Sequence, residues 1–290
     1  MTDYIVVDRR GVPVLSGGQS ARTVWMHSAA KPLQLLPLLV RDLDQVYALS
    51  PGELALLSSS HLGQPQHIEA LRSILTKTGL RESSLVLPPA APGGKVSYRN
   101  WLLCGGKKRR LFHPCSGIHI AIMLLQRELT GDTAGYERMS SPAQREILRY
   151  IQDYTGEVPM LKLDHCGIPT YGVSLGSVAS AYQKLGKEAL SGISARLVSA
   201  LHTAPVMVEG DGCISTVLCS DSDLVAKTAV NHLLAIGDQR RGLGCAIISD
   251  EGWENIVEAL CEISVQISIV NKELEYRLKQ IMRLYCKRKT

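Results

Sequence analysis

Segments with the pattern of β-strands stand at the two ends of this chain, and helical patterns fill the middle. Residues 5–7 begin a hairpin-like stretch, and residues 224–228 and 243–249 are short apolar runs of strand length. Segments of helical length occupy the chain between residues 28 and 202 and return after residue 250. Because first and last strands placed in this way can pair in one sheet, the pattern predicts an α+β fold.

The sequence indicates some of these helices more clearly than others. Residues 28–40 are apolar almost all round, which is typical of a helix buried on every side. Ser141 has the chemistry of a helix start, because proline follows it and glutamine stands three residues on. Further helices are expected at residues 53–57, 68–80, 115–129, 174–185, 187–202, 251–268 and 271–286. Residues 1–290 are expected to form a single catalytic unit; the alternative is a sheet lobe (about 1–27 plus 205–290) and a helical part (about 28–204).

Composition excludes several classes of protein. The hydrophobic share is 45%, the charged share is 20%, and the net charge is only +5, as in an ordinary soluble globular chain. Two basic clusters, residues 107–110 and 287–289, lack the aromatic interleaving and the motifs of nucleic-acid binding. We therefore expect no nucleic-acid partner.

The N-terminus and the cysteines bear on the compartment. The first residues have no basic segment followed by an apolar one, so a signal peptide is not expected. No run approaches the ~20 apolar residues of a membrane span, so no membrane partner is expected and the predicted location is the cytoplasm. In that compartment the eight cysteines are interpreted as free thiols or metal ligands.

A serine–lysine pattern is the main chemical signal. Ser28 precedes Lys31 by three residues, and Lys227-Thr228 lies far downstream in a strand-like run. Serine β-lactamases and penicillin-binding proteins carry their nucleophile and lysines in this order. Residues three apart on a helix share a face, so the lysine could accept the serine proton. Taken alone, the pattern also fits an exposed polar pair on a helix.

Several longer blocks follow the first serine in order. They occupy residues 28–34, 56–67, 113–119 and 164–169. Together they resemble the rhizobial-type L-asparaginases (asparaginase II) over roughly residues 5–250. The resemblance implies a β-lactamase-like fold, a homodimer, and hydrolysis of L-asparagine to L-aspartate and ammonia through an acyl-enzyme.

The resemblance also implies two serine–lysine pairs. Ser28 is paired with Lys31, and Ser60 is paired with Lys227. Ser60 is chosen from its serine triplet because it directly precedes His61 in a Ser-His-x-Gly pattern. Ser28 is slightly favoured as the nucleophile, because its lysine would lie one helical turn away, and Ser60 remains the alternative.

Three residues are predicted to bind the substrate. Asp164 is the carboxylate best suited to an α-ammonium group, although it could instead cap the turn at Gly167. His27 stands where the resemblance leads us to expect arginine, so a contact to the α-carboxylate there would be weaker. His61 is the third predicted contact.

A zinc ion is the predicted cofactor. Relatives hold it with two cysteines and a lysine; the cysteines correspond to Cys115 and Cys166, but Ile118 replaces the lysine. His119 could supply the missing ligand one turn after Cys115, and His165 is a further candidate. The alternative is a pair of buried thiols without metal.

Other departures concern the substrate site. The expected Lys-Thr-Gly-Ala-Glu-Gly becomes residues 227–232 with Ala229 and His232 in place of glycines, Cys213 replaces an arginine, and Gln64 replaces a glutamate. A shortened N-terminal strand region could leave a sheet edge open to another chain. The leading hypothesis is an asparaginase or related amidohydrolase; the alternatives are a degenerate, non-catalytic homologue and a β-lactamase-like enzyme.

Overall fold

The larger of two sheets joins the two ends of the chain. The computed structural model describes residues 1–188 and 191–286. Five antiparallel strands follow the order β2-β1-β8-β7-β6. Their bounds are β1 Thr2–Val7, β2 Pro13–Gly17, β6 Leu224–Ala229, β7 Leu233–Asp238 and β8 Leu243–Ser249. β1 pairs with β8 from Thr2↔Ser249 to Val7↔Gly244, so the predicted pairing of first and last strands and the α+β class are confirmed.

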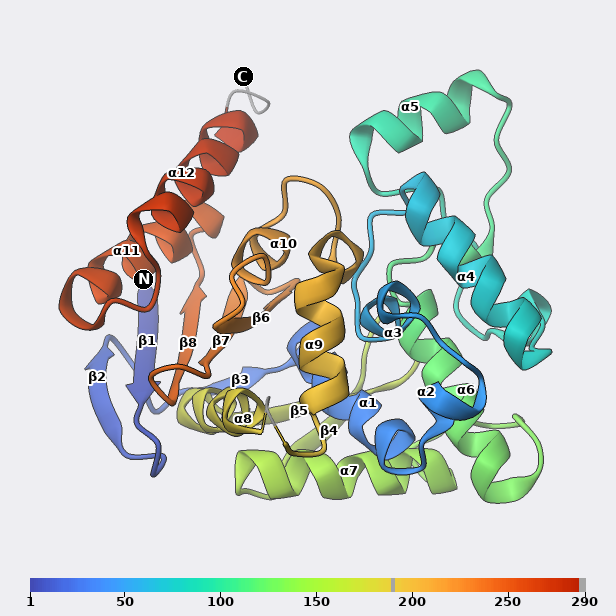
Figure 1. Ribbon diagram of the computed structural model, residues 1–290, viewed down its shortest axis with the longest axis horizontal. Helices are drawn as coiled ribbons and strands as arrows, with labels where there is room; N and C mark the ends of the chain where they lie inside the picture. The colour runs from blue at the N-terminus through green and yellow to red at the C-terminus, as the bar shows by residue number, and fades with distance from the viewer. Residues whose placement is uncertain (189–190, 287–290) are drawn as a thin grey trace.

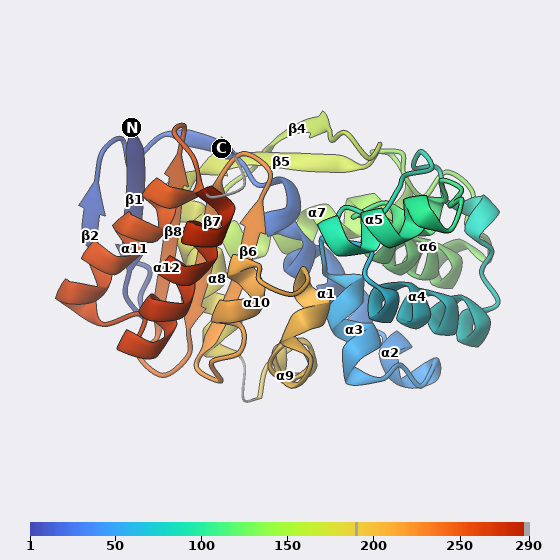
Figure 2. The same cartoon turned by 90° about the horizontal axis from the view of Figure 1, so that it is seen from above.

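Helices cover both faces of this sheet. α8 (Leu175–Lys187) packs on one face, while α11 (Trp253–Ile267) and α12 (Lys272–Cys286) lie on the other side (Figure 2). Glycines allow the close approach of α8. A Cβ on Gly237 would lie 2.1 Å from the Tyr182 carbonyl oxygen, and one on Gly244 would lie 2.0 Å from that of Ala179.

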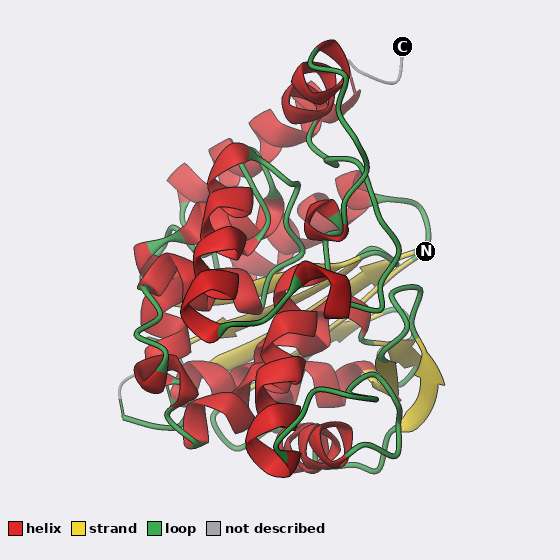
Figure 3. Cartoon of the chain, turned by 90° about the vertical axis from the view of Figure 1, so that its right-hand side faces the viewer, coloured by secondary structure: helices red, strands yellow, loops and turns green. Residues whose placement is uncertain are grey.

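The helical part of the molecule is built around α1 (Lys31–Val40). Nine of the ten residues of α1 are buried, as its all-round apolar sequence predicts, and it packs against α6 (Ser116–Thr130) and α7 (Pro142–Thr155) (Figure 1). Figure 3 shows how much of the molecule is helical, with the strands confined to a smaller part of it. The other helices are α2 Leu43–Val46, α3 Pro51–Leu57, α4 Pro65–Thr78, α5 Lys95–Leu103, α9 Ala195–Thr203 and α10 Ile214–Leu218. Short 3₁₀ turns cover η1 His27–Ala30, η2 Glu82–Ser84, η3 Arg110–Phe112 and η4 Pro205–Val208.

A second sheet was not expected. β3 (Thr23–Trp25), β5 (Pro169–Ser174) and β4 (Met160–Leu163) form three antiparallel strands, and β4 and β5 lie in the region interpreted as purely helical. Neither strand shows the alternation that marks a half-buried strand, because β4 is exposed along its length and β5 is almost wholly buried. This sheet holds the chain just before α1: the Met26 amide donates to the Tyr171 carbonyl at 2.9 Å.

Several predicted bounds shift. The helix expected at 28–40 is divided into η1 and α1, and the one expected at 187–202 is replaced by the shorter α9. Residues 189–190 and the basic tail 287–289 lie outside the described residues. None of the helices in the described part of the chain has the length and apolar character of a membrane span.

Candidate active site

One cavity collects most of the predicted site residues. Its volume is about 590 Å³, and it lies where η1, the segment after α3, the start of α6, the β4–β5 turn and β6 meet. The predicted residues that line it are His27, Ser28, Ser60, His61, Cys115, Asp164 and Cys166. The two predicted lysines lie behind this lining: Lys31 is 3% exposed and Lys227 is 1% exposed.

Lys31 is the centre of the hydrogen bonding. It is the first residue of α1, and its Nζ donates to Ser60 Oγ at 2.9 Å and to the Ser59 carbonyl at 2.6 Å. A third contact joins Nζ to Cys115 Sγ at 3.4 Å. The structure thus pairs Lys31 with Ser60 rather than with Ser28. Among the described residues, no hydrogen bond joins Lys31 Nζ to Ser28, which lies in the 3₁₀ turn η1.

The second lysine is held by β6. Lys227 Nζ donates to the Thr228 carbonyl at 3.1 Å, and no hydrogen bond joins it to Ser60 in the part of the chain that is described. Burial lowers the pKa of Lys227 below 10.5, the positive charge of Lys31 lowers it further, and Glu209 opposes both effects.

Glu209 is a lining residue that the sequence reasoning missed. The chain after α3 runs beside it, because the Ser60 amide donates to the Val208 carbonyl and the Leu62 amide donates to the Glu209 carbonyl at 2.9 Å. Its side chain lies in the cavity wall and accepts a hydrogen bond from Thr228 Oγ1 at 3.0 Å. The available signal was an acidic residue in the glycine-containing run just before α10, in which only Cys213 was singled out.

Asp164 and His27 are brought together but bind each other. His27 Nδ1 lies 3.1 Å from Asp164 Oδ1, and the His165 amide donates to the same carboxylate at 2.7 Å. Burial would raise the pKa of Asp164, but these two hydrogen bonds hold it below 3.8. His27 also has an unusual backbone, with φ at 43°. His27 and Asp164 therefore contribute to the wall of the cavity, but each already has the other as a partner.

His61 has both ring nitrogens in use. Nδ1 accepts from the Gly63 amide at 3.1 Å, so Nε2 carries the hydrogen and donates to Ser116 Oγ at 2.8 Å. Burial lowers the pKa of His61 well below 6.5, which keeps the ring neutral. His61 thus fixes the segment that carries Ser60, and it also lines the cavity, so the substrate contact stays a prediction.

Cys115 and Cys166 lie together, and Lys31 and His113 lie beside Cys115. Cys166 donates a hydrogen bond to Cys115, which lowers the pKa of Cys115 well below 9.0 with the help of Lys31, although burial opposes it. The same bond and burial raise the pKa of Cys166. The two sulfurs thus form a hydrogen-bonded pair beside Lys31.

Among the described residues, the predicted ligand His119 does not join the two cysteines. Within residues 1–188 and 191–286, no three His, Cys, Asp or Glu side chains gather as a metal-binding group. Ile118 is fully buried, and His119 Nδ1 bonds the Tyr136 hydroxyl at 2.8 Å. His119 Nε2 is buried without a hydrogen-bond partner among the described residues, and burial lowers its pKa to about 3. Zinc remains a prediction, and no step below depends on it.

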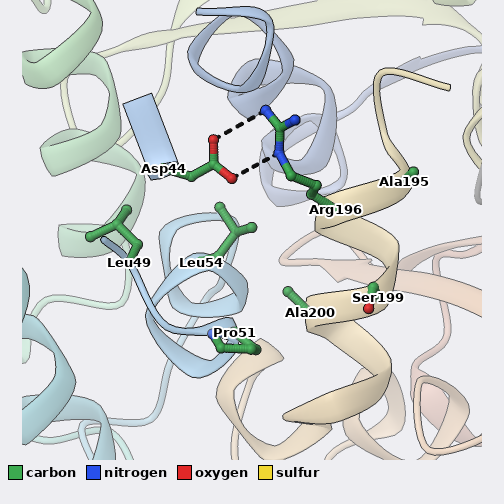
Figure 4. A pocket seen from close by; sticks show the side chains of 8 residues that line it. All are labelled: Asp44, Leu49, Pro51, Leu54, Ala195, Arg196, Ser199 and Ala200. Carbon is green, nitrogen blue, oxygen red and sulfur yellow. Dashed lines mark hydrogen bonds and ion pairs between the residues drawn. The ribbon is translucent and has the colours of Figure 1, made fainter. Parts of the chain in front are cut away.

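A second cavity, of about 440 Å³, holds no predicted site residue. It lies between α3 and α9 (Figure 4), and its charged groups satisfy one another: Arg196 Nε donates to Asp44 at 2.9 Å. Arg196 also bonds Asp42 and the Leu39 carbonyl. This ion pair joins two helices, and the cavity shows no chemistry comparable to that around Lys31.

Two serines and two buried lysines around one cavity, on a fold of helices and antiparallel sheets, define a protein with a serine–lysine site. The chain belongs to the L-asparaginase II family, whose model matches residues 1–289. This confirms the resemblance drawn from the sequence blocks. Membership of this family supports the interpretation of the protein as an amidohydrolase. Among curated proteins no match was found.

Proposed function

We propose that this protein hydrolyses the side-chain amide of L-asparagine to L-aspartate and ammonia through a serine–lysine acyl-enzyme. The observation that carries the proposal is the 2.9 Å contact between Lys31 Nζ and Ser60 Oγ at the wall of the cavity. Nucleophilic catalysis needs a hydroxyl and a base within hydrogen-bond reach, at about 2.6–3.2 Å. Family membership supports the choice of an amide as substrate.

In the proposed reaction, Lys31 acts in its neutral amine form and takes the proton of Ser60 while Oγ attacks the carboxamide carbon. The resulting ammonium group then gives the proton to the departing nitrogen, and ammonia leaves. In the second half, Lys31 takes a proton from water, which attacks the ester, and returns it to Ser60 Oγ as aspartate leaves. Lys227, in its ammonium form, favours the oxyanion that forms in each half. The sequence slightly favoured Ser28 as nucleophile; the Lys31 contact moves the preference to Ser60, with Ser28 the other hydroxyl in the cavity.

Ammonia release from L-asparagine is the direct test. Lys31→Met should reduce the rate by about 10²- to 10⁴-fold, because that is the usual contribution of a positioned general base. Lys187→Met, on the exposed end of α8, is the matched control and should keep wild-type activity. Equal activity in the Lys31 variant and the control would contradict the mechanism.

The nucleophile is identified by rapid quenching and mass spectrometry. The acyl group should be found on Ser60, and Ser60→Ala should not accumulate it, whereas an adduct on Ser28 would reverse the two roles. Folded wild-type protein that releases no ammonia would favour the degenerate homologue, for which the mutual engagement of His27 and Asp164 is the supporting observation.

The quaternary structure and the fold type are proposals as well. A homodimer and a β-lactamase-like arrangement are both consistent with family membership, and the expected location remains the cytoplasm. The strand β2 lies at one edge of the larger sheet and β6 at the other. A light-scattering mass measurement in solution would test the dimer.

A further inference from the structure

The strand end that carries Lys227 has no carboxylate of its own. Residues 227–232 contain neither aspartate nor glutamate, and the partner of Lys227 on β7 is Ala235. Lys227 is 1% exposed, and its one hydrogen bond among the described residues goes to the neutral Thr228 carbonyl at 3.1 Å. Burial of an ammonium group is costly unless a negative charge compensates it. The charged form of Lys227 therefore depends on a carboxylate from another segment.

Glu209 is the carboxylate that reaches this strand end. Thr228 Oγ1 donates to Glu209 Oε2 at 3.0 Å, while the carbonyl of the same threonine accepts from Lys227 Nζ. A single residue thus bonds both charged groups. Because Lys227 is buried, the attraction between the two charges is weakened by water much less than it would be on the surface.

Two buried hydroxyls hold this carboxylate in place. Ser215 Oγ accepts from the Thr228 amide at 3.0 Å and lies 3.0 Å from Thr228 Oγ1. Because Thr228 gives its hydroxyl proton to the carboxylate, Ser215 donates to Thr228. Ser215 is 0% exposed and Thr228 is 4% exposed. The chain of hydroxyls therefore ends on the carboxylate, and a glutamine at position 209 could accept the same hydrogen bond without the charge.

The backbone around Glu209 is tied to the segment that carries Ser60. The Ser60 amide donates to the Val208 carbonyl at 3.2 Å, and the Leu62 amide donates to the Glu209 carbonyl at 2.9 Å. On the other side, Thr216 Oγ1 of α10 donates to the Gly210 carbonyl at 2.8 Å. Glu209 is thus joined through its main chain to the segment of the proposed nucleophile and through its side chain to the strand of the second lysine.

The other ionisable groups that act on Lys227 cannot replace this carboxylate. They are Lys31 on α1, and Cys213 and Cys219 at the two ends of α10. Lys31 carries no negative charge in either of its forms. Burial raises the pKa of both thiols, that of Cys219 to about 11, so both cysteines are neutral at pH 7. Among the described residues, the negative charge that acts on Lys227 at neutral pH is therefore that of Glu209.

We propose that Glu209 is a positioning residue of the serine–lysine site, which fixes the strand end of Lys227 against the Ser60 segment and supplies the counter-charge of the Lys227 ammonium group. The inference rests on the proposed function, in which this ammonium group favours the oxyanion. Without the carboxylate, Lys227 gives up its proton at lower pH, and a neutral amine no longer provides the positive charge. Glu209 transfers no proton and forms no bond to the substrate in this role.

The pKa of Lys227 tests the counter-charge without any turnover. The lysines are labelled with ¹³C at Cε, the Lys227 signal is assigned by its loss in Lys227→Met, and its chemical shift is followed in an NMR titration. Glu209→Gln should lower the pKa of Lys227 by about one unit or more, because a close opposite charge usually shifts a pKa by about 1–3 units. Glu209→Asp keeps the charge and should restore much of the difference. Asp211→Asn removes an exposed carboxylate that bonds Gln64 and should leave the pKa of Lys227 unchanged.

The pH profile of ammonia release tests the role in catalysis. In the wild type the rate should fall at alkaline pH as Lys227 loses its proton, and Glu209→Gln should move this descending limb to lower pH by the same interval. Thr228→Val keeps the carboxylate but removes the hydroxyl that holds it, so the limb should move in the same direction by a smaller amount. Asp211→Asn should keep the wild-type profile. A merely structural role of Glu209 would lower the rate at every pH and leave the limb in place.

The outcomes separate this proposal from the proposed function. An unchanged pKa of Lys227 in folded Glu209→Gln would overturn the positioning role, and so would a lowered pKa with an unmoved limb. If Glu209→Gln does not fold, the same titration of Thr228→Val decides, and an unchanged pKa of Lys227 there overturns the role as well. A lowered pKa of Lys227 in Glu209→Gln, together with wild-type protein that releases no ammonia from L-asparagine, would overturn the hydrolysis and support the charge pairing.

Discussion

At the scale of single residues, Lys227 is a charged group in an energetically unfavourable position. Its side chain is 1% exposed, yet the described residues give its ammonium group only one hydrogen bond, to the Thr228 carbonyl. Burial lowers its pKa below 10.5 because the charged form loses its hydration. The unfolded chain keeps the ordinary pKa and binds the proton more tightly than the folded chain does.

This difference predicts a stability effect with a definite sign. The unfavourable contribution is fully present below the folded pKa of Lys227 and is relieved as the pH rises from that value toward 10.5. Lys227→Met should therefore raise the Tm at pH 7, by an amount that narrows toward pH 10, while ammonia release is lost. Thermal unfolding followed by circular dichroism at both pH values is the measurement. A lower Tm than wild type at pH 7 would contradict the assignment of Lys227 as a strained, functional cation.

At the scale of elements, the packing of α8 on the larger sheet depends on missing side chains. A Cβ on Gly244 would lie 2.0 Å from the Ala179 carbonyl and 2.7 Å from Gln183 Cβ, and backbone cannot move as a flexible side chain can. Gly244→Ala should destabilise the protein by about 1–3 kcal/mol or more, the usual range for overpacking.

A matched substitution lies in the same interface. A Cβ on Gly176, within α8, would make an ordinary contact at 3.5 Å with Ile5 Cδ1, and alanine is preferred to glycine in a helix by about 0.5–1 kcal/mol. Gly176→Ala should therefore keep or raise the midpoint of urea unfolding, while Gly244→Ala lowers it. Similar midpoints for the two variants would show that α8 can move away from β8.

The elements also show which parts of the fold the sequence could predict. β8 has the predicted bounds and α1 is buried on every side, because strand length and all-round apolar character are local signals. β7 was not predicted, although it is buried on both faces just as β6 and β8 are. Most site residues were identified from motifs, but their partners were not. The Lys31–Ser60 and His27–Asp164 contacts join residues 29 and 137 positions apart, which only the tertiary fold decides.

At the scale of the whole molecule, ion pairs connect the N-terminal strand β1 to the segment that follows β8. Asp3, 1% exposed, accepts from the Gln19 amide at 2.7 Å and from Arg22 at 2.8 Å, and Arg22 reaches Asp250 beside β8 at 3.3 Å. Burial would raise the pKa of Asp3, but these donors hold it below 3.8. Its stabilising effect is therefore present above that pH and is lost as the pH falls through the folded value.

Asp3→Asn should lower stability at pH 7 by about 1–3 kcal/mol, because Arg22 and the Gln19 amide lose a charged acceptor. The difference from wild type should shrink below pH 4. Asp250→Asn removes the exposed partner of the same arginine and should cost no more than about 1 kcal/mol. Urea unfolding at pH 7 and pH 3.5 measures the stability of both variants. An equal loss of stability in Asp3→Asn and Asp250→Asn would contradict a special role for Asp3 and would assign the stabilisation to Arg22.

The pairing of β1 with β8 has a consequence for how the chain is made. β8, one of the two strands that pair with β1, is synthesised more than two hundred residues after β1. At ~5–20 residues per second, this takes roughly ten to fifty seconds on the ribosome. The nascent chain meanwhile holds Ser28, Lys31 and Ser60 without the strand that carries Lys227. Closure of the sheet is a slow long-range step, so we expect partly synthesised chains to lack the complete candidate site until β6, β7 and β8 have joined β1.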